Sequence, residues 1–237
     1  MSATFEGFKP DAVRFLLELR ANNERAWFQS RKSEFERLLK EPLEALCAAV
    51  GERFVARRIP LRADVRSPFR IYRDVRFSKD KSPYKTHVAA SFAWAGDGAP
   101  KGLQGKAEQA HGAGGYFHFG PDEAWVGGGL WRPERPLIEA WRSLVTKEPK
   151  RLHQAIDAPA FTRAFGQLDG DRLLRVPPGY PPDHPDAELL KLKDVTFGRP
   201  LTTDEVLSAD LPDVLADAFA AAVPVMALLA ALRPGAG

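Results

Sequence analysis

Two strand-like segments joined by a tight turn constrain the fold of this chain more than any other feature. Residues 115–119 and 124–129 have the aromatic and small residues of strands, and the Gly-Pro-Asp sequence at 120–122 is typical of a turn. Two earlier segments, 69–75 and 86–94, are also strand-like, the first by its alternation of branched and aromatic residues. Because no helical pattern separates these successive segments, they predict an antiparallel sheet in the middle of the chain.

Helical patterns dominate the residues before the sheet. Pro10-Asp11 places a proline and an acid in a first turn and so predicts the start of a helix, which Asn22-Asn23 ends. An apolar stripe with a period of 3.6 residues over 27–39 predicts a second helix. Pro42 is expected to open a third helix that ends near Gly51.

The last third of the chain mixes helices with short strands. Thr203 is a candidate cap for a short helix, and residues 212–232 predict two alanine-rich helical segments separated at Pro224. The other predicted segments are helices over 135–146 and 158–165, short strands over 172–176 and 192–197, and an irregular proline-rich stretch over 177–185. We therefore predict an α+β fold, with an antiparallel sheet flanked by N-terminal and C-terminal helices.

Length and composition favour one soluble domain over residues 1–237, with a mobile loop at 96–115. A chain of 237 residues with 44% hydrophobic and 27% charged residues can bury a substantial core. The most apolar stretch, 218–232, is expected to be too short for a membrane span and to be broken by Pro224. The N-terminus has no basic region followed by an apolar run, so we expect a cytoplasmic protein without a membrane partner.

Charge and metal-binding residue types argue against several classes of function. The net charge of +3 is weaker than a dedicated nucleic-acid binder would carry. The single cysteine, Cys47, excludes an internal disulfide and a cysteine-based zinc site, and its apolar surroundings predict a buried residue. No histidine lies in an H-x-x-x-H or H-E-x-x-H pattern, so we predict no metal and no cofactor.

The densest charge cluster lies in residues 70–87. Cations at such density repel one another unless negative charge is nearby, so this segment is either a solvated surface or an anion site. Its arginine forks and lysine charges suit a phosphate or a carboxylate, whereas a salt-bridged structural loop is the alternative. The cations are Arg70, Arg73, Arg76, Lys79, Lys81 and Lys85; Asp74 and Asp80 could neutralise some of them, and Tyr72, Phe77 and Tyr84 lie between them.

Glycines and histidines supply further candidates. Gly127, Gly128 and Gly129 predict close approach by a ligand or by another backbone, and their spacing fits neither a Walker loop nor a dinucleotide fingerprint. His118 could face a groove, and His184 lies in a proline-bounded loop. Both are weak acid–base candidates, as are Asp74 and Asp80, because a single histidine is more often structural. Arg25, beside two asparagines, either joins the same polar cleft or belongs to a helix cap.

The chain resembles the bacterial and fungal proteins of domain-of-unknown-function family 2461. The resemblance covers nearly the whole chain and implies a single domain, but it implies no reaction. It rests on Asn22-Asn23-x-Arg25-x-Trp27-Phe28, on Arg73-Asp74-x-Arg76-Phe77-Ser78-Lys79-Asp80-Lys81-Ser82-Pro83-Tyr84-Lys85, on Gly127-Gly128-Gly129-Leu130-Trp131-x-Pro133, and on His184-Pro185 followed by Leu190-x-x-Lys193.

Three hypotheses for function remain open at the level of sequence. The first is a cleft on residues 70–87 that binds a small phosphorylated or carboxylated molecule. The second is a nucleic-acid-binding module, in which the aromatic residues stack bases. The third is a non-catalytic interaction domain that contains a buried salt-bridge network. The predicted ligand-binding residues of the first hypothesis are Arg73, Arg76, Lys79, Lys81, Tyr84, Lys85, Gly127, Gly128, Gly129 and Arg25.

Overall fold

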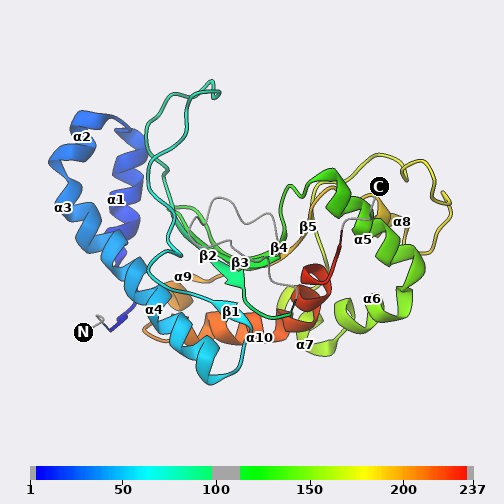
Figure 1. Ribbon diagram of the computed structural model, residues 1–237. Helices are drawn as coiled ribbons and strands as arrows, with labels where there is room; N and C mark the ends of the chain where they lie inside the picture. The colour runs from blue at the N-terminus through cyan, green and yellow to red at the C-terminus, as the bar shows by residue number, and fades with distance from the viewer. Residues whose placement is uncertain (1–3, 98–112, 234–237) are drawn as a thin grey trace.

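The centre of the protein is a five-stranded antiparallel sheet, which confirms the predicted α+β class. A computed structural model describes residues 4–97 and 113–233 (Figure 1). The strands follow one another across the sheet in chain order, and each neighbouring pair is antiparallel. They are β1 (Leu61–Arg62), β2 (Val88–Trp94), β3 (Gly114–Phe119), β4 (Ala124–Leu130) and β5 (Val195–Pro200).

Helices precede and follow the sheet in the sequence, as predicted. Before it lie α1 (Pro10–Ala21), α2 (Arg25–Ser30), α3 (Lys32–Phe35), the π-helical turn η1 (Glu36–Lys40) and α4 (Glu41–Ala56). Four helices connect β4 to β5: α5 (Arg135–Lys147), α6 (Pro149–Ile156), α7 (Pro159–Phe165) and α8 (Ala187–Leu190). The chain ends with α9 (Thr203–Leu207) and α10 (Leu211–Ala230).

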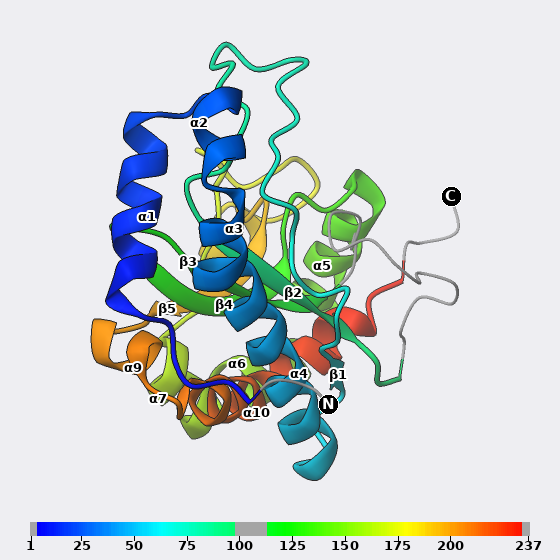
Figure 2. The ribbon, with the colours of Figure 1, turned by 90° about the vertical axis from the view of Figure 1, so that its left-hand side faces the viewer.

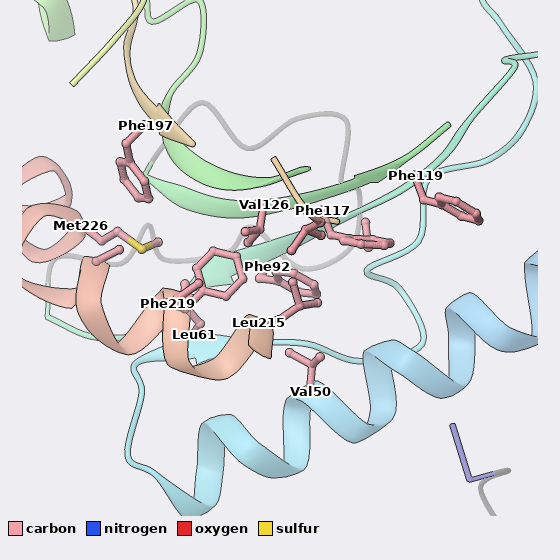
Figure 3. Packing of buried hydrophobic residues seen from close by; sticks show 14 of the residues in the cluster. Val50, Leu61, Phe92, Phe117, Phe119, Val126, Phe197, Leu215, Phe219 and Met226 are labelled. Atoms are coloured by element: carbon pink, nitrogen blue, oxygen red, sulfur yellow. The ribbon is translucent and has the colours of Figure 1, made fainter. Parts of the chain in front are cut away.

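The hydrophobic core lies between one face of the sheet and the helices α4 and α10. Figure 3 shows side chains of the sheet pointing toward α10, which carries Phe219, and α4, which carries Val50. The alternation of a strand explains this arrangement, because Phe117 and Val126 lie opposite each other in the register and both are fully buried. Phe219 packs edge-to-face on Phe92, so the helix is held by aromatic contacts as well as by burial of area.

Helix α10 is continuous, so the predicted break at Pro224 is wrong. Pro224 lies inside the 20-residue helix and removes one backbone hydrogen bond. Packing of the helix against the core compensates for that loss. Among the described helices, α10 alone has the length and apolar composition of a membrane span, with a mean hydropathy of 1.8. The expectation that the apolar segment is too short for a span is therefore also wrong. Half of that window is buried inside the protein, as expected of a core helix.

The N-terminal helices also differ from their predicted bounds. The single helix predicted over 27–39 is divided into α2, α3 and η1, with a break at Arg31. Helix α4 does not end near Gly51 but continues to Ala56. A side chain at Gly51 would meet the carbonyl oxygen of Ala63 at 2.4 Å, so the glycine permits a close approach rather than a helix end.

Two predicted strands are absent as regular elements. Residues 69–75 contribute only one isolated bridge, Tyr72–Tyr84, and the bridge Pro68–Ala90 comes just before them. Pro68 and Pro83, on the two sides of the arm, have no N–H to donate to a ladder. Residues 172–176 contribute a single bridge from Arg172 to Leu192. The strand predicted over 192–197 is present but shifted to Val195–Pro200.

Smaller corrections concern caps and loops. Thr202, not Thr203, caps α9, and its hydroxyl accepts from the backbone N–H of Glu205 in a capping box. Helix α6 was not predicted. Most of the loop predicted at 96–115 lies outside the described residues, and its last two residues belong to β3.

We predict that Gly115→Ala lowers the free energy of unfolding by about 1–3 kcal/mol, because overpacking of a rigid core costs that much. The new methyl group would lie 2.5 Å from the ring of Phe219, which is fully buried. Urea unfolding measures the change. Gly198→Ala is the control, since its methyl group would meet no atom closer than 3.3 Å. Equal stability of the two variants would contradict this packing.

Candidate functional site

Residues 70–87 form an arm that rises from the edge of the sheet. Figures 1 and 2 show it beside α1 and α2, reaching beyond the sheet. Its two sides pair irregularly: the N–H of Arg73 donates to the carbonyl of Pro83 at 2.9 Å, and the N–H of Lys85 donates to Ile71 at 2.8 Å. The segment singled out by its charge is therefore a hairpin-like projection with a tip and a base.

At the tip of the arm, Arg73 is held by a carboxylate. Its guanidinium forms an ion pair with Asp80 and donates to the carbonyl of Ser82 at 3.3 Å. The hydroxyl and backbone N–H of Ser82 both donate to Asp80, at 2.6 and 2.9 Å. These bonds from Ser82, and then the ion pair with Arg73, hold the pKa of Asp80 well below its usual range.

The second ion pair of the tip joins Arg76 to Asp74. Nε and Nη2 of Arg76 lie 3.0 and 2.7 Å from the two carboxylate oxygens, and these bonds lower the pKa of Asp74 to about 2. Lys81 donates to the carbonyl of Val75 at 3.0 Å. The internal neutralisation expected from the sequence is confirmed. The Arg76 side chain is 77% exposed, however, so this ion pair is not the buried network of the third hypothesis.

The base of the arm is anchored to the α1–α2 junction by Asn23. Its amide accepts from the N–H of Tyr84 at 3.1 Å and donates to the carbonyl of Tyr84 at 2.9 Å. The Tyr84 ring is 2% exposed and stacks on Phe28, with centroids 4.1 Å apart. Asn23 therefore fixes where the arm leaves the body, and the side chain of Tyr84 belongs to this anchor. Arg25, at the start of α2, is exposed.

The face of the sheet opposite α10 carries a different set of side chains, which we call the open face. Its members follow from the strand registers and from the alternation of side chains. Most of them are half-buried, and Gly198 and Pro200 are exposed. The open face consists of Ala89, Ser91, Ala93, Gly114, Tyr116, His118, Trp125, Gly127, Gly129, Thr196, Gly198 and Pro200.

Five rings form an aromatic cluster on the open face and at the base of the arm: Phe69, His87, Tyr116, His118 and Trp125. The rings of His87 and His118 have centroids 4.4 Å apart, and His118 stacks on Trp125 at 5.8 Å. Tyr116 contacts both Trp125 at 4.9 Å and Phe69 at 5.9 Å. Lys85 places its Nζ 5.1 Å from the centroid of the Phe69 ring, so a cation borders the cluster.

Burial sets the protonation of this cluster. Nδ1 of His118 lies 3.5 Å from the Tyr116 hydroxyl, and Nε2 lies 3.6 Å from a carboxylate oxygen of Glu123. Burial lowers the pKa of His118, and it raises the pKa of Tyr116 to about 12. Burial, followed by repulsion from His118 and Lys85, lowers the pKa of His87 to about 4. At pH 7 both imidazoles are therefore neutral, and each can donate and accept a hydrogen bond.

The glycines of β4 are explained first by the neighbouring strands. A Cβ at Gly127 would lie 2.2 Å from the carbonyl oxygen of Phe197, and one at Gly128 would lie 2.5 Å from that of Gly114. Gly129 has a φ of +116°, and a Cβ there would lie 2.2 Å from the carbonyl oxygen of Val195. Of the two predicted causes, approach by another backbone is present here. A ligand-binding role for these glycines stays a prediction.

A sequence model described as "Conserved hypothetical protein (DUF2461)" matches residues 11–227. The chain belongs to this family. The resemblance seen in the sequence motifs is thereby confirmed. No curated protein and no solved structure matches the chain.

The motifs that indicated DUF2461 lie in three parts of the structure. The Asn22–Phe28 motif anchors the arm, the Arg73–Lys85 motif is the arm itself, and the glycine motif forms β4. His184 lies apart: its Nδ1 accepts from the N–H of Asp186 at 3.0 Å, and no contact in the described residues links it to the aromatic cluster. The structure therefore places His118 in the aromatic cluster and Lys85 at its border, but it does not bring His184 to them.

Other candidate chemistry is limited in the described part of the chain. The structure places no group of three or more His, Cys, Asp or Glu side chains there that could hold a metal. Cys47 is buried, and burial raises its pKa, which disfavours the reactive thiolate. Lys79 is exposed at the tip of the arm.

Sequence reasoning missed most of the aromatic cluster. It considered His118 but did not select His87, Tyr116 or Trp125 as site residues. Period-2 alternation does place Tyr116 and His118 on one face of β3. The meeting of His87 with His118, however, depends on the β2–β3 register, which pairs Ala89 with His118.

We predict that Asn23→Ala lowers the free energy of unfolding by about 1–3 kcal/mol, because two part-buried hydrogen bonds to Tyr84 are lost. It should also speed proteolytic cleavage within the arm. Chemical denaturation and limited proteolysis measure the two effects. Asn22→Ala is the matched control, since in the described residues its side chain donates to the Glu18 carbonyl at the end of α1 and not to the arm. If Asn22→Ala loses as much stability as Asn23→Ala and is cleaved as fast, Asn23 does not anchor the arm.

We predict that His87 makes the protein less stable as the pH falls from about 6.5 to about 4. Its pKa is lowered from 6.5 to about 4 on folding, so in this window the unfolded chain binds a proton that the folded protein does not. After allowance for partial exposure, the loss should be on the order of 1 kcal/mol. Urea unfolding at several pH values, compared with His87→Gln, measures it. An identical pH slope in the variant would contradict the assignment.

Proposed function

We propose that the protein binds a small phosphorylated or carboxylated molecule at the base of the arm, on the open face of the sheet. One observation carries the proposal: the imidazoles of His87 and His118 are in contact at the base of the arm, and Lys85 places its ammonium group beside the neighbouring Phe69 ring. The two rings are 4.4 Å apart, and Lys85 is close enough to lower the pKa of His87. An anion at this point would accept hydrogen bonds and would stabilise the protonated form of His87.

The base of the arm suits an anion better than the tip does. The tip is more exposed, and water and salt weaken charge interactions there. That the cations of the tip bind the ligand stays a prediction. The variants described below distinguish a site at the tip from a site at the base.

Proton uptake should accompany binding at this site. A phosphate near His87 would stabilise the imidazolium form and raise the pKa of that ring from its low value. Affinity for phosphate should therefore increase as the pH falls from 7 toward 5, while the protein remains folded. The same proton exchange would allow His87 or His118 to act in acid–base chemistry on a bound substrate.

We expect phosphate, sulfate or citrate to raise the melting temperature of the wild-type protein. An anion present at one hundred times its Kd stabilises a protein by about 2.7 kcal/mol, or about 5–10 °C at this chain length. Lys85→Met should abolish the shift, whereas Arg76→Ala at the tip should retain it. Arg14→Ala, which removes an exposed helix cation paired with Asp11, controls for net charge.

Two results of this experiment would overturn the proposal. If no anion stabilises the wild-type protein, there is no anion site. If Arg76→Ala abolishes the shift and Lys85→Met does not, the site lies at the tip of the arm.

A second candidate function, nucleic-acid binding by the tip, is favoured by Phe77. Its side chain is 95% exposed and lies beside the Arg76 guanidinium, 5.8 Å from the ring centroid. An exposed ring next to cations can stack a base while the cations contact phosphates. In this case, single-stranded DNA or RNA should bind in a strongly salt-dependent manner, and Phe77→Ala should weaken binding at least tenfold. Absent or salt-insensitive binding in a filter or anisotropy assay would exclude this function.

A further inference from the structure

We propose that His153 is a pH-dependent latch, which in its protonated form holds the loop before α8 against α6. This loop, residues 174–186, is called the proline loop below. The proposal rests on one imidazole ring that lies between two carboxylates from different elements. Nδ1 of His153 is 2.8 Å from an oxygen of Asp157, just after α6, and Nε2 is 2.9 Å from an oxygen of Asp186, just before α8. The latch does not depend on the anion site.

The imidazolium form of His153 is required to satisfy both contacts. An ionised carboxylate only accepts hydrogen bonds, and a neutral imidazole has one N–H, so the neutral ring can donate to one aspartate but not to both. Its second nitrogen would then direct a lone pair at the other carboxylate. The hydrogen bond to Asp157, and then the one to Asp186, outweigh partial burial and raise the pKa of His153 above its ordinary value of 6.5.

Other charged groups around the latch have partners of their own or are exposed. In the described residues, the charged side chains that contact His153 are those of Asp157 and Asp186. Helix α6 packs against α5, α7 and α10. The ion pairs on α6 and on the elements around it are Arg151–Glu148, Arg142–Glu139, Lys191–Glu188, Arg53–Asp213 and Arg57–Asp217, and the exposed charged groups include Arg135, Lys147, Lys150, Arg163, Arg175 and Asp183.

A second histidine contacts the same aspartate with the opposite protonation requirement. Nδ1 of His184 accepts from the backbone N–H of Asp186 at 3.0 Å, and it can do so only while that nitrogen carries no proton. Protonation of His184 would therefore loosen Asp186, whereas protonation of His153 holds it. Variants of the two histidines can separate their effects.

The proline loop is fixed at both ends by contacts that do not depend on a histidine. At its start, the N–H of Leu173 donates to the carbonyl of Lys191 at 2.8 Å. After its end, the side chains of Trp141 and Arg142 donate to backbone carbonyls of α8 at 3.0 and 3.1 Å. Figure 1 shows the loop, in yellow, extending beyond α5 and α8 between these fixed ends. A change in the latch should therefore open the loop locally without unfolding the body.

Among the described residues, two side-chain hydrogen bonds tie the proline loop to α5 and α6. The hydroxyl of Tyr180 donates to Glu139 at a long 3.4 Å, and Asp186, whose side chain is 14% exposed, accepts from His153. Because the pKa of His153 is raised on folding, the stability from the latch is fully present below pH 6.5 and is lost as the pH rises through the raised pKa. The loop therefore opens more often in mildly alkaline than in mildly acidic solution.

Hydrogen exchange of backbone amides by NMR between pH 5.5 and 8.5, corrected for the intrinsic rate at each pH, measures this opening. We expect protection at Ala187 and Leu190 to fall about threefold over this range, which is the size expected for one partly exposed ion pair. His153→Gln removes the imidazolium and should give low protection that does not change with pH. His184→Ala is the matched control and should keep the pH dependence, while amides of β3 report the global stability.

Three results would overturn the latch: equal protection of Ala187 and Leu190 at pH 5.5 and 8.5 in the wild-type protein, a pH dependence that His153→Gln retains, or one that His184→Ala removes. A titration of the histidine ring protons tests the proposal even if His153→Gln does not fold. We expect the pKa of His153 to lie above 6.5 in the wild-type protein and to fall in Asp186→Asn. A wild-type pKa at or below 6.5, or one that Asp186→Asn leaves unchanged, would also overturn it.

Discussion

The packing of α10 against one face of the sheet determines the rest of the structure. Phe219 of this helix packs between Phe92 and Phe54, and it leaves no room for a side chain at Gly115. Because of this contact, one set of alternating residues in β2 and β3 faces the core. Since side chains of a strand alternate, the same packing places Tyr116 and His118 on the open face, away from the helix. The candidate site is thus a consequence of the core.

The arm shows how burial gives different roles to charges that are close in sequence. At its tip, each aspartate pairs with an arginine in water, where such a pair contributes little to stability. At its base, the Lys85 ammonium borders a half-buried aromatic cluster, where it disfavours protonation of His87. Asn23 lies where these two environments meet, and its two hydrogen bonds hold the backbone of Tyr84 in place. The charged segment 70–87 is therefore solvated at its tip, whereas at its base a neighbouring charge changes the pKa of His87.

The sequence predicts the features that depend on local chemistry. The β3–β4 hairpin follows from the Gly-Pro-Asp sequence at 120–122, and the start of α1 follows from Pro10. Features that depend on tertiary packing were not predictable in this way. Pro224 is a helix breaker by local rules, yet burial holds α10 continuous. The contact between His87 and His118 depends on strand register, and the charge of residues 70–87 does not reveal which of its cations lie at the base of the arm.

The central claim is that the functional anion site lies at the base of the arm, beside His87. Its most direct test is an NMR titration of the histidine ring protons with and without inorganic phosphate. The account predicts that His87 titrates near pH 4 in the free protein and that phosphate raises this pKa by at least one unit, with the resonances of His184 unchanged. A His87 pKa that is the same with and without saturating phosphate would contradict the account.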